Sequence, residues 1–218
     1  MEQKPRAFSS KKRYLAAVII ATVIFLIIFA VSYSLSYFEF QRISNLQAGV
    51  GYDIFEDKLD YSLFGANICN TSSFEEVSRD LAFQGLIIDD LENKLGKQDE
   101  NVLLRKKFYS LIEIEHLEFV KAFNQKCNPK VDTILFFYSN NESKASQSEE
   151  AGKILGVVSS KDEDLVVYSF DFDLESDLVD KLEARYNITD SDIPVIVINE
   201  KTKIKMPAKI QEIEKHLS

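Results

Sequence analysis

The pattern of apolar positions divides the chain into three parts. Near the N-terminus, every residue from Leu15 to Val31 is apolar except one threonine. From there to Cys127, apolar residues recur mostly every three or four positions, which is the spacing of one face of an α-helix. After Pro129, short apolar runs alternate with helix-like segments, as in α/β domains. The sequence therefore predicts an α/β protein with an N-terminal transmembrane helix, an α-helical hairpin or stalk, and a C-terminal βαβαββα domain.

The first apolar run is long enough to cross a membrane. A helix from Tyr14 to Tyr37, rising about 1.5 Å per residue, would be roughly 36 Å long, and the hydrocarbon core of a bilayer is roughly 30 Å thick. Tyrosines at both ends would lie at the two interfaces. The alternative is a cleaved signal peptide, with a weak small-residue site at Ala30-Val31-Ser32, but signal peptides usually have an apolar core of about 7–15 residues. We therefore predict an uncleaved transmembrane helix over residues 14–37.

The charges beside this helix indicate its direction. Glu39 and Arg42 follow it closely, whereas five basic residues precede it: Lys4, Arg6, Lys11, Lys12 and Arg13. The positive-inside rule then places a cytoplasmic tail at residues 1–13 and the remaining chain outside the cell membrane. An even number of cysteines agrees with an oxidising location. Three Asn-x-Ser/Thr sequons agree as well, and their candidate glycosylation sites are Asn70, Asn141 and Asn187.

Residues 38–128 are predicted to form the helical hairpin or stalk. The spacing of Ile43, Leu46, Val50 and Ile54 is helical, although Gly49 and Gly51 interrupt it. Ser73 and Glu76 form a capping-box pattern at the start of a second helix. Residues 96–99 (Gly-Lys-Gln-Asp) are a plausible turn, and Asn128-Pro129 ends a third helix. The predicted apolar stripe of the second helix is Phe74, Val77, Leu81, Ile88, Leu91 and Leu95, and that of the third is Leu104, Phe108, Leu111, Glu115, Phe119 and Phe123.

The two cysteines occupy matching ends of these last two helices. Because the helices are similar in length and joined by a short turn, they should run antiparallel, which brings Cys69 beside Cys127. A disulfide there would stabilise the fold by about 4 kcal/mol through the entropy of closing the loop. The alternative is a redox-active pair, although such pairs are usually close in sequence. The helices themselves could serve as a spacer or as a coiled coil that forms a homodimer.

Residues 129–218 alternate between strand-like and helix-like segments. The predicted strands are Val131–Tyr138, Leu165–Phe170, Asp192–Asn199 and a short one near Ile204–Met206. The predicted helices run from about Ser146 to Val157, from about Leu174 to Tyr186, and to Leu217. This order predicts a βαβ unit followed by a β-hairpin and a helix.

The order resembles the thioredoxin fold, and Ile193-Pro194 at the entrance of the strand PVIVIN resembles its cis-proline, which faces the active-site loop. LFFYSN at the end of the first strand and YSFDFDL at the second also resemble uncharacterised, membrane-anchored thioredoxin-like proteins of archaea. The resemblance covers most of the chain. It implies a thioredoxin-like domain with Pro194 opposite the loop after the first strand.

This chain departs from that family where its chemistry would lie. In place of Cys-x-x-Cys, the loop reads Ser143-Lys144-Ala145-Ser146. A serine hydroxyl cannot take part in thiol–disulfide exchange. Ser143 and Ser146 therefore mark a degenerate redox site, and either one is also a suitable helix N-cap.

The remaining composition argues against several functions. The net charge is −9, which disfavours nucleic-acid binding. His116 and His216 have no neighbours spaced for zinc, and no nucleotide-binding motif is found, so no metal or cofactor is predicted. A weak Ca²⁺ site is an alternative for one acidic cluster, although acids at a helix N-terminus explain it more simply: Asp171, Asp173, Asp177 and Asp180.

These observations favour a non-enzymatic, membrane-bound domain. Its expected partners are the lipid bilayer and another envelope protein, or an extended polypeptide held beside Pro194 by strand-like pairing. No catalytic residue is predicted. The competing hypothesis is a membrane-anchored thiol–disulfide oxidoreductase or isomerase in which Cys69 and Cys127 are the working pair.

Overall fold

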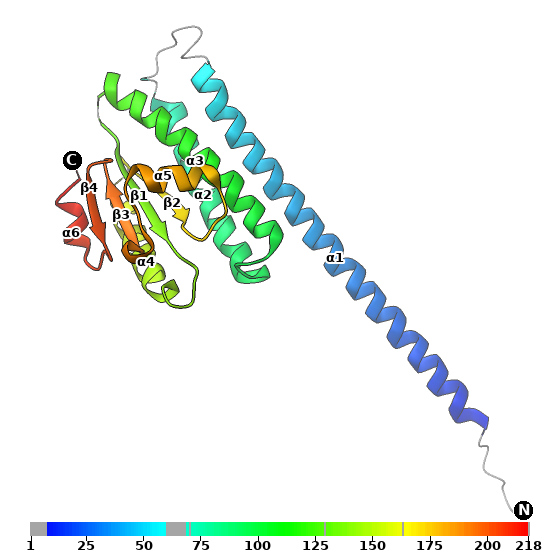
Figure 1. Cartoon of the computed structure of the whole chain (residues 1–218). Coiled ribbons are helices and arrows are strands. Elements are labelled where there is room, and N and C mark those ends of the chain that lie inside the picture. The colour runs from blue at the N-terminus through cyan, green and yellow to red at the C-terminus, as the bar shows by residue number, and fades with distance from the viewer. Residues whose placement is uncertain (1–7, 60–68, 70, 129, 163, 218) are drawn as a thin grey trace, which may run out of the picture. The chain divides into compact units, whose positions relative to one another are not determined.

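The protein is a mixed α/β structure with one long N-terminal helix (Figure 1). The computed structural model describes residues 8–59, 69, 71–128, 130–162 and 164–217. Within them lie six α-helices, a short 3₁₀ turn and one four-stranded sheet. The chain divides into two compact units, Met1–Asn45 and Leu46–Ser218.

Helix α1 is a single helix from Phe8 to Leu59. It contains the span Arg13–Leu35, which is long and apolar enough to cross a membrane and whose described apolar side chains are exposed. No proline interrupts it, and a glycine inside a helix costs only about 1 kcal/mol, so Gly49 and Gly51 do not end it. The side chains of its predicted stripe (Ile43, Leu46, Val50 and Ile54) lie outside the described residues.

Helices α2 (Thr71–Leu95) and α3 (Glu100–Lys126) form an antiparallel hairpin. Hydrogen bonds pair residues in reverse order along them, from Ser78 with His116 to Glu92 with Lys106. Between the helices, Gly96 adopts φ 96°, and the Asp99 carboxylate caps α3 by accepting hydrogen bonds from two backbone N–H groups. The predicted turn at residues 96–99 is therefore confirmed. The side chains of the predicted capping box at Ser73 and Glu76 lie outside the described residues.

The sheet is built from four strands in the order β2-β1-β3-β4. Strands β1 and β2 are parallel, and β3 runs antiparallel to both β1 and β4. The strands are Asp132–Tyr138 (β1), Leu165–Asp171 (β2), Val195–Ile198 (β3) and Thr202–Lys205 (β4). The helices that connect and follow them are Ala145–Ser159 (α4), Asp177–Arg185 (α5) and Ile210–Glu214 (α6).

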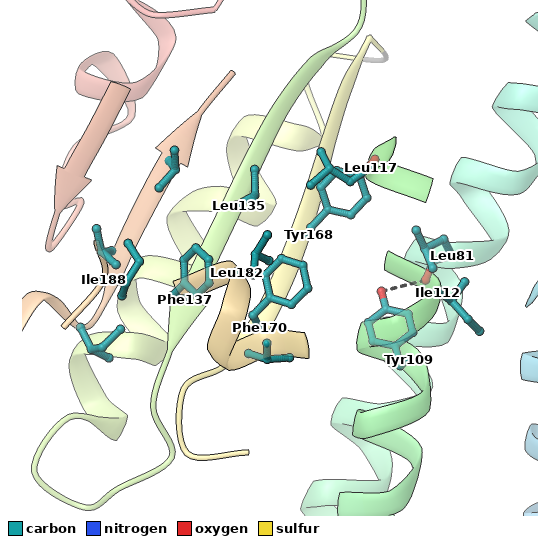
Figure 2. Packing of buried hydrophobic residues seen from close by; sticks show 14 of the residues in the cluster. Leu81, Tyr109, Ile112, Leu117, Leu135, Phe137, Tyr168, Phe170, Leu182 and Ile188 are labelled. Atoms are coloured by element: carbon teal, nitrogen blue, oxygen red, sulfur yellow. Dashed lines mark hydrogen bonds between the residues drawn. The ribbon is translucent and has the colours of Figure 1, made fainter. Parts of the chain in front are cut away.

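Apolar residues fill both faces of the sheet. Alternate side chains of β1 point to opposite faces, so Leu135 and Phe137 join one core cluster and Ile134 and Phe136 join the other. The first cluster includes α5 and the α2–α3 hairpin, and the second includes α4 and α6. Figure 2 shows members of the first cluster, including Leu182 of α5 and Tyr109 of α3. The hairpin therefore shares its core with the sheet.

Helix α3 buries a face of mixed polarity and exposes several apolar side chains. Leu104, Phe108 and Leu111 are 65%, 41% and 45% exposed, so half of the predicted apolar stripe faces solvent. The buried face carries five polar residues: Arg105, Lys106, Ser110, Glu113 and His116. The sequence-based stripe was therefore wrong for this part of α3. The reason is that strand β2, which lies at the edge of the sheet, supplies polar partners for the buried side chains.

Candidate functional site

The loop between β1 and α4, where the resemblance places the redox motif, is held by Asp173. The Asp173 carboxylate accepts hydrogen bonds from the Ser139 hydroxyl at 2.6 Å and from the backbone N–H groups of Asn140 and Asn141 at 3.0 and 3.2 Å. The Ser139 N–H in turn donates to the Ser148 hydroxyl of α4 at 3.1 Å. The loop therefore has a fixed geometry set by residues of β2's C-terminal end and α4.

Ser143 and Ser146 both lie on the surface of this loop and the first turn of α4. The N-cap of α4 is Lys144, which makes no side-chain capping bond, so the expectation that Ser143 or Ser146 would be the N-cap was wrong. Asn141 performs a related role: its side-chain oxygen accepts from the N–H and the hydroxyl of Ser143, both at 3.3 Å. The side chains of both Ser143 and Ser146 are exposed.

Lys144 connects this loop to the segment that leads into β3. Its ammonium group bonds the backbone oxygen of Asp190 at 2.6 Å and also the Asp190 carboxylate. Asp190 begins the 3₁₀ turn Asp190–Asp192, which immediately precedes Ile193-Pro194. The middle of the Ser143–Ser146 stretch and the approach to Pro194 are thus in direct contact.

Asp192 anchors the other side of the same turn. Its carboxylate is buried, pairs with Lys203 at 2.8 Å and with Lys205, and accepts from the backbone N–H of Thr189 at 3.0 Å. The hydrogen bonds from Lys203 and Lys205 hold the pKa of Asp192 well below its usual range. The turn is therefore tied to β4 by a carboxylate that stays charged.

Pro194 itself is buried at the start of β3. The Ile193-Pro194 peptide is cis. The backbone groups around it have internal partners: Ile193 N–H donates to Asp190 O at 3.4 Å, and Pro194 O accepts from Met206 N–H at 2.7 Å. Asp190, Ser191 and Met206, which lie close to Pro194 in sequence or through this bond, are exposed, and so are Ser143 and Ser146 on the loop that Lys144 joins to Asp190.

Cys69 and Cys127 form a disulfide with a Cα–Cα distance of 5.4 Å. It joins the residues just before α2 and just after α3, and Cys127 is only 3% exposed among Val120, Phe123 and Val131. No cysteine among the described residues is free. Of the three sequons, Asn141 and Asn187 are exposed, and Asn70 lies outside the described residues.

A buried ionic cluster lies beside the loop. The ammonium of Lys106 (α3) contacts the Glu92 carboxylate (α2) at 2.7 Å and the Asp171 carboxylate (β2), and all three side chains are less than 9% exposed. Asn140 donates to both acids, at 3.3 and 3.1 Å. Burial acts to lower the pKa of Lys106, but its interactions with Tyr138, Asp171 and Glu92 outweigh burial and raise it. These contacts therefore favour the charged form of Lys106, which is not nucleophilic.

Two further buried groups connect α3 to β2. Glu113 is fully buried and accepts from the Ser169 N–H at 2.7 Å, and its other oxygen has no hydrogen-bond partner among the described residues. Burial raises the pKa of Glu113 well above 4.5. His116 bonds the Tyr168 hydroxyl at 2.9 Å and the Ser78 hydroxyl at 3.3 Å. Because burial leaves His116 no exposed surface and lowers its pKa to about 4, it is a neutral packing residue.

Sequence reasoning missed the Lys106 cluster, and no local signal could have revealed it. Lys106, Glu92 and Asp171 come from three different elements, and each looks like a surface residue in its own helix or strand. Part of the acidic group suggested as a Ca²⁺ site is instead engaged by Lys106, Asn140 and the loop. Among the described residues, no three His, Cys, Asp or Glu side chains are placed to hold a metal ion.

The structure thus combines a helix long and apolar enough to cross a membrane with an α/β domain whose β1–α4 loop carries Ser143. Comparison of the chain with protein-family models, with curated proteins and with solved structures finds no match. The function must therefore be argued from this geometry alone.

Proposed function

We propose that the protein is a membrane-anchored, redox-inactive thioredoxin-like domain that binds an extended segment of another envelope protein. Residues 1–13 would lie in the cytoplasm, residues 14–37 would span the cell membrane, and the α/β domain would be outside. The βαβαββα order supports this proposal, because it is the order that the resemblance to thioredoxin-like proteins implies. The span Arg13–Leu35 supports the anchor.

The contact between Lys144 and Asp190 is the observation that carries the proposal. It joins the two segments that would form the substrate-facing surface of a thioredoxin-like domain. On that surface, serines occupy both positions of the degenerate motif. Thiol exchange needs a thiolate that attacks a disulfide sulfur, so this surface can hold a polypeptide without exchanging electrons with it.

The competing oxidoreductase hypothesis is disfavoured by the position of the disulfide. An incoming thiolate must approach one of the two sulfurs along the S–S axis. Cys127 is buried among apolar side chains and Cys69 is only partly exposed, so this approach is restricted at both sulfurs. The bond closes 58 residues of chain, and the entropy of that loop alone would stabilise the fold by about 4 kcal/mol. The disulfide is therefore suited to a structural role.

Because the backbone at Ile193 and Pro194 is internally paired, the partner would contact the exposed side chains more than the β3 backbone. Met206 supplies an apolar side chain that is 52% exposed, and Ser143, Ser146 and Ser191 supply hydroxyl groups. Such a mixed surface is suited to a modest, reversible interaction.

The test uses the full chain in lipid nanodiscs and a fluorescein-labelled, carboxymethylated insulin B chain as an extended probe without thiols. We expect saturable binding by fluorescence anisotropy. Ser146→Trp, which places a bulky side chain on the proposed surface, should weaken binding about tenfold, equivalent to about 1.4 kcal/mol. Ser160→Trp at the exposed far end of α4 is the matched control and should bind like the unmodified protein.

The same preparation is assayed for reduction of intact insulin by dithiothreitol. Catalysed reduction that disappears in Cys69→Ala/Cys127→Ala would overturn the redox-inactive assignment in favour of the oxidoreductase. Absence of probe binding, or equal binding by Ser146→Trp, would contradict the proposed surface.

A further inference from the structure

A cleft separates the helical hairpin from α4 and has edge strand β2 along its floor. Its volume is about 360 Å³, within the range of small-molecule sites. Helix α2 contributes Gly85 and Leu86, α3 contributes Tyr109 and Ser110, and α4 contributes Gly152, Leu155 and Gly156 along with further residues. Every lining element belongs to the same compact unit, Leu46–Ser218.

The cleft has a polar end and an apolar body. The polar end lies at the start of α4, where Asn140 bonds Glu92 and Asp171, and where Lys97 bonds the Asn140 oxygen at 2.8 Å. Away from it, the walls are apolar and include Leu86, Phe136, Leu155 and Val167. From Glu92 back to Ala82, the cleft follows α2 for on the order of 15 Å. Such a cavity suits a molecule with one polar head and an apolar body.

The charges of the lining favour a cationic head. Four carboxylates face two ammonium groups; the acids are Asp89, Glu92, Glu149 and Asp171, and the bases are Lys97 and Lys106. Even with Glu149 paired to Lys153, which lies outside the lining, acids still exceed bases. The ammonium of Lys106 is already held by Glu92 and Asp171, and that of Lys97 bonds the neutral Asn140 amide, so the acidic excess falls on Asp89 and on the Lys106 cluster, which has two carboxylates for one ammonium.

Aromatic rings add to this preference. Phe136, Tyr138 and Tyr109 line the cleft, and aromatic faces attract ammonium ions. The protein itself places one there, because the Lys106 ammonium lies 5.1 Å from the centre of the Tyr138 ring. Excess carboxylates and aromatic walls are the features by which proteins recognise organic ammonium ions.

Two glycines of α4 give the cleft its room. A Cβ added at Gly156 would meet no atom within 4 Å, and one at Gly152 would come only to 3.7 Å from the Phe136 ring. A larger side chain at Gly156 would therefore project into open space along the cleft, and replacing a glycine within a helix favours the helix. Gly156 is thus a position at which the cleft can be narrowed without loss of the fold.

We propose that this cleft binds a small amphipathic molecule with a primary ammonium head and an apolar body. The head would lie beside Asp89, next to Glu92 at the polar end of the cleft, and the body between Leu86, Gly156 and Leu155. This site is separate from the surface around Ser143 and Asp190, so the inference does not depend on the proposed polypeptide binding.

The test compares three water-soluble probes that share one body: 3-phenylpropylamine, 3-phenylpropanol and 3-phenylpropionate. Binding to the full chain in nanodiscs of zwitterionic lipid is measured by isothermal titration calorimetry, with empty nanodiscs as the blank. We expect saturable binding of the amine to a single site, about tenfold tighter than binding of the propionate, with the alcohol between them.

Variants then locate the site. Gly156→Leu should weaken amine binding about tenfold or more, whereas Val157→Leu, on the exposed neighbouring position outside the lining, should not. Asp89→Asn should weaken binding of the amine and leave that of the alcohol unchanged. Thermal unfolding of each variant establishes that it is folded. Absence of saturable amine binding, propionate binding as tight as amine binding, or full binding by Gly156→Leu would each overturn the proposal.

Discussion

Buried charged side chains connect the α2–α3 hairpin to the sheet. Lys106 of α3 is the only cation of a cluster whose two acids come from α2 and β2, so one side chain connects three elements. Desolvating such a group is costly, and the cost is offset only while every charged partner is present. Removing the cation would leave two carboxylates, each less than 9% exposed, without their positive partner.

Lys106→Met is therefore expected to lower the free energy of unfolding by about 3–5 kcal/mol, because it leaves Glu92 and Asp171 uncompensated. Urea denaturation of the full chain, followed by circular dichroism, measures the loss. Lys153→Met breaks the exposed ion pair with Glu149 and is the control, which should leave stability almost unchanged. If both substitutions lowered the free energy of unfolding equally, the buried cluster would contribute no more to stability than the exposed ion pair.

Glu113 should make stability depend on pH. Its pKa is raised in the folded protein by burial, so the folded state retains a proton that the unfolded chain releases above about pH 4.5. This contribution is complete below pH 4.5 and is lost as the pH rises toward the folded-state pKa. Glu113→Gln copies the protonated form, so its stability relative to the unmodified protein should increase from pH 5 to pH 8. A difference independent of pH in paired urea titrations would contradict this assignment.

At the scale of elements, helix α3 carries several polar side chains on its buried face, where they meet strand β2. Strand β2 is an edge strand, and its Ser169 N–H donates to the Glu113 carboxyl while the Tyr168 hydroxyl bonds His116. The hairpin thus covers an edge that would otherwise be open to pairing with other chains. Leu104, Phe108 and Leu111 face the opposite way, and the buried apolar contacts of α3 are made by Val102, Tyr109, Ile112, Leu117, Val120 and Phe123.

Truncating the side chains of two adjacent residues of α3 should therefore lower the free energy of unfolding by very different amounts. Ile112→Ala removes a side chain that is 5% exposed and should cost about 2–5 kcal/mol, because it leaves a cavity in the core. Leu111→Ala, next to it, removes a side chain that is 45% exposed and should change stability by no more than about 0.5 kcal/mol. Thermal unfolding of the two variants checks the orientation of the helix. Comparable losses would mean that the outward face of α3 is also covered.

At the scale of the whole molecule, the proposed arrangement joins a membrane-spanning helix to an extracytoplasmic domain. The span Arg13–Leu35 is preceded by basic residues, and by the positive-inside rule the proposed topology keeps them in the cytoplasm. The two native cysteines are joined in a disulfide, so they would not react with a thiol reagent. Introduced cysteines can therefore report which side of the membrane each part occupies.

Ser160→Cys should be labelled by a membrane-impermeant maleimide on intact cells, because Ser160 is exposed on the α/β domain. Ser9→Cys, which precedes the apolar span, should be labelled only after the membrane is permeabilised. Gel-shift of the labelled protein measures both reactions, and the unmodified protein is the background control. The reverse pattern of labelling would place the domain in the cytoplasm and overturn the predicted topology.

Much of the local structure could be predicted from the sequence. The long apolar run, the turn at residues 96–99 and the βαβαββα order all follow from short-range patterns, and the structure contains each of them. The disulfide between Cys69 and Cys127 followed from one further step, because two similar helices joined by a short turn must bring their outer ends together. These features depend on residues that are close in sequence or related by a single turn.

The tertiary structure alone decided which face of α3 is buried, how Lys106 meets Glu92 and Asp171, and where a cleft remains beside Gly156. An apolar stripe indicates the buried face only when the neighbouring element is apolar, and here the neighbour is a strand edge with polar groups to satisfy. Contacts among residues 92, 106 and 171 arise from packing three separate elements, and no spacing along the chain encodes them.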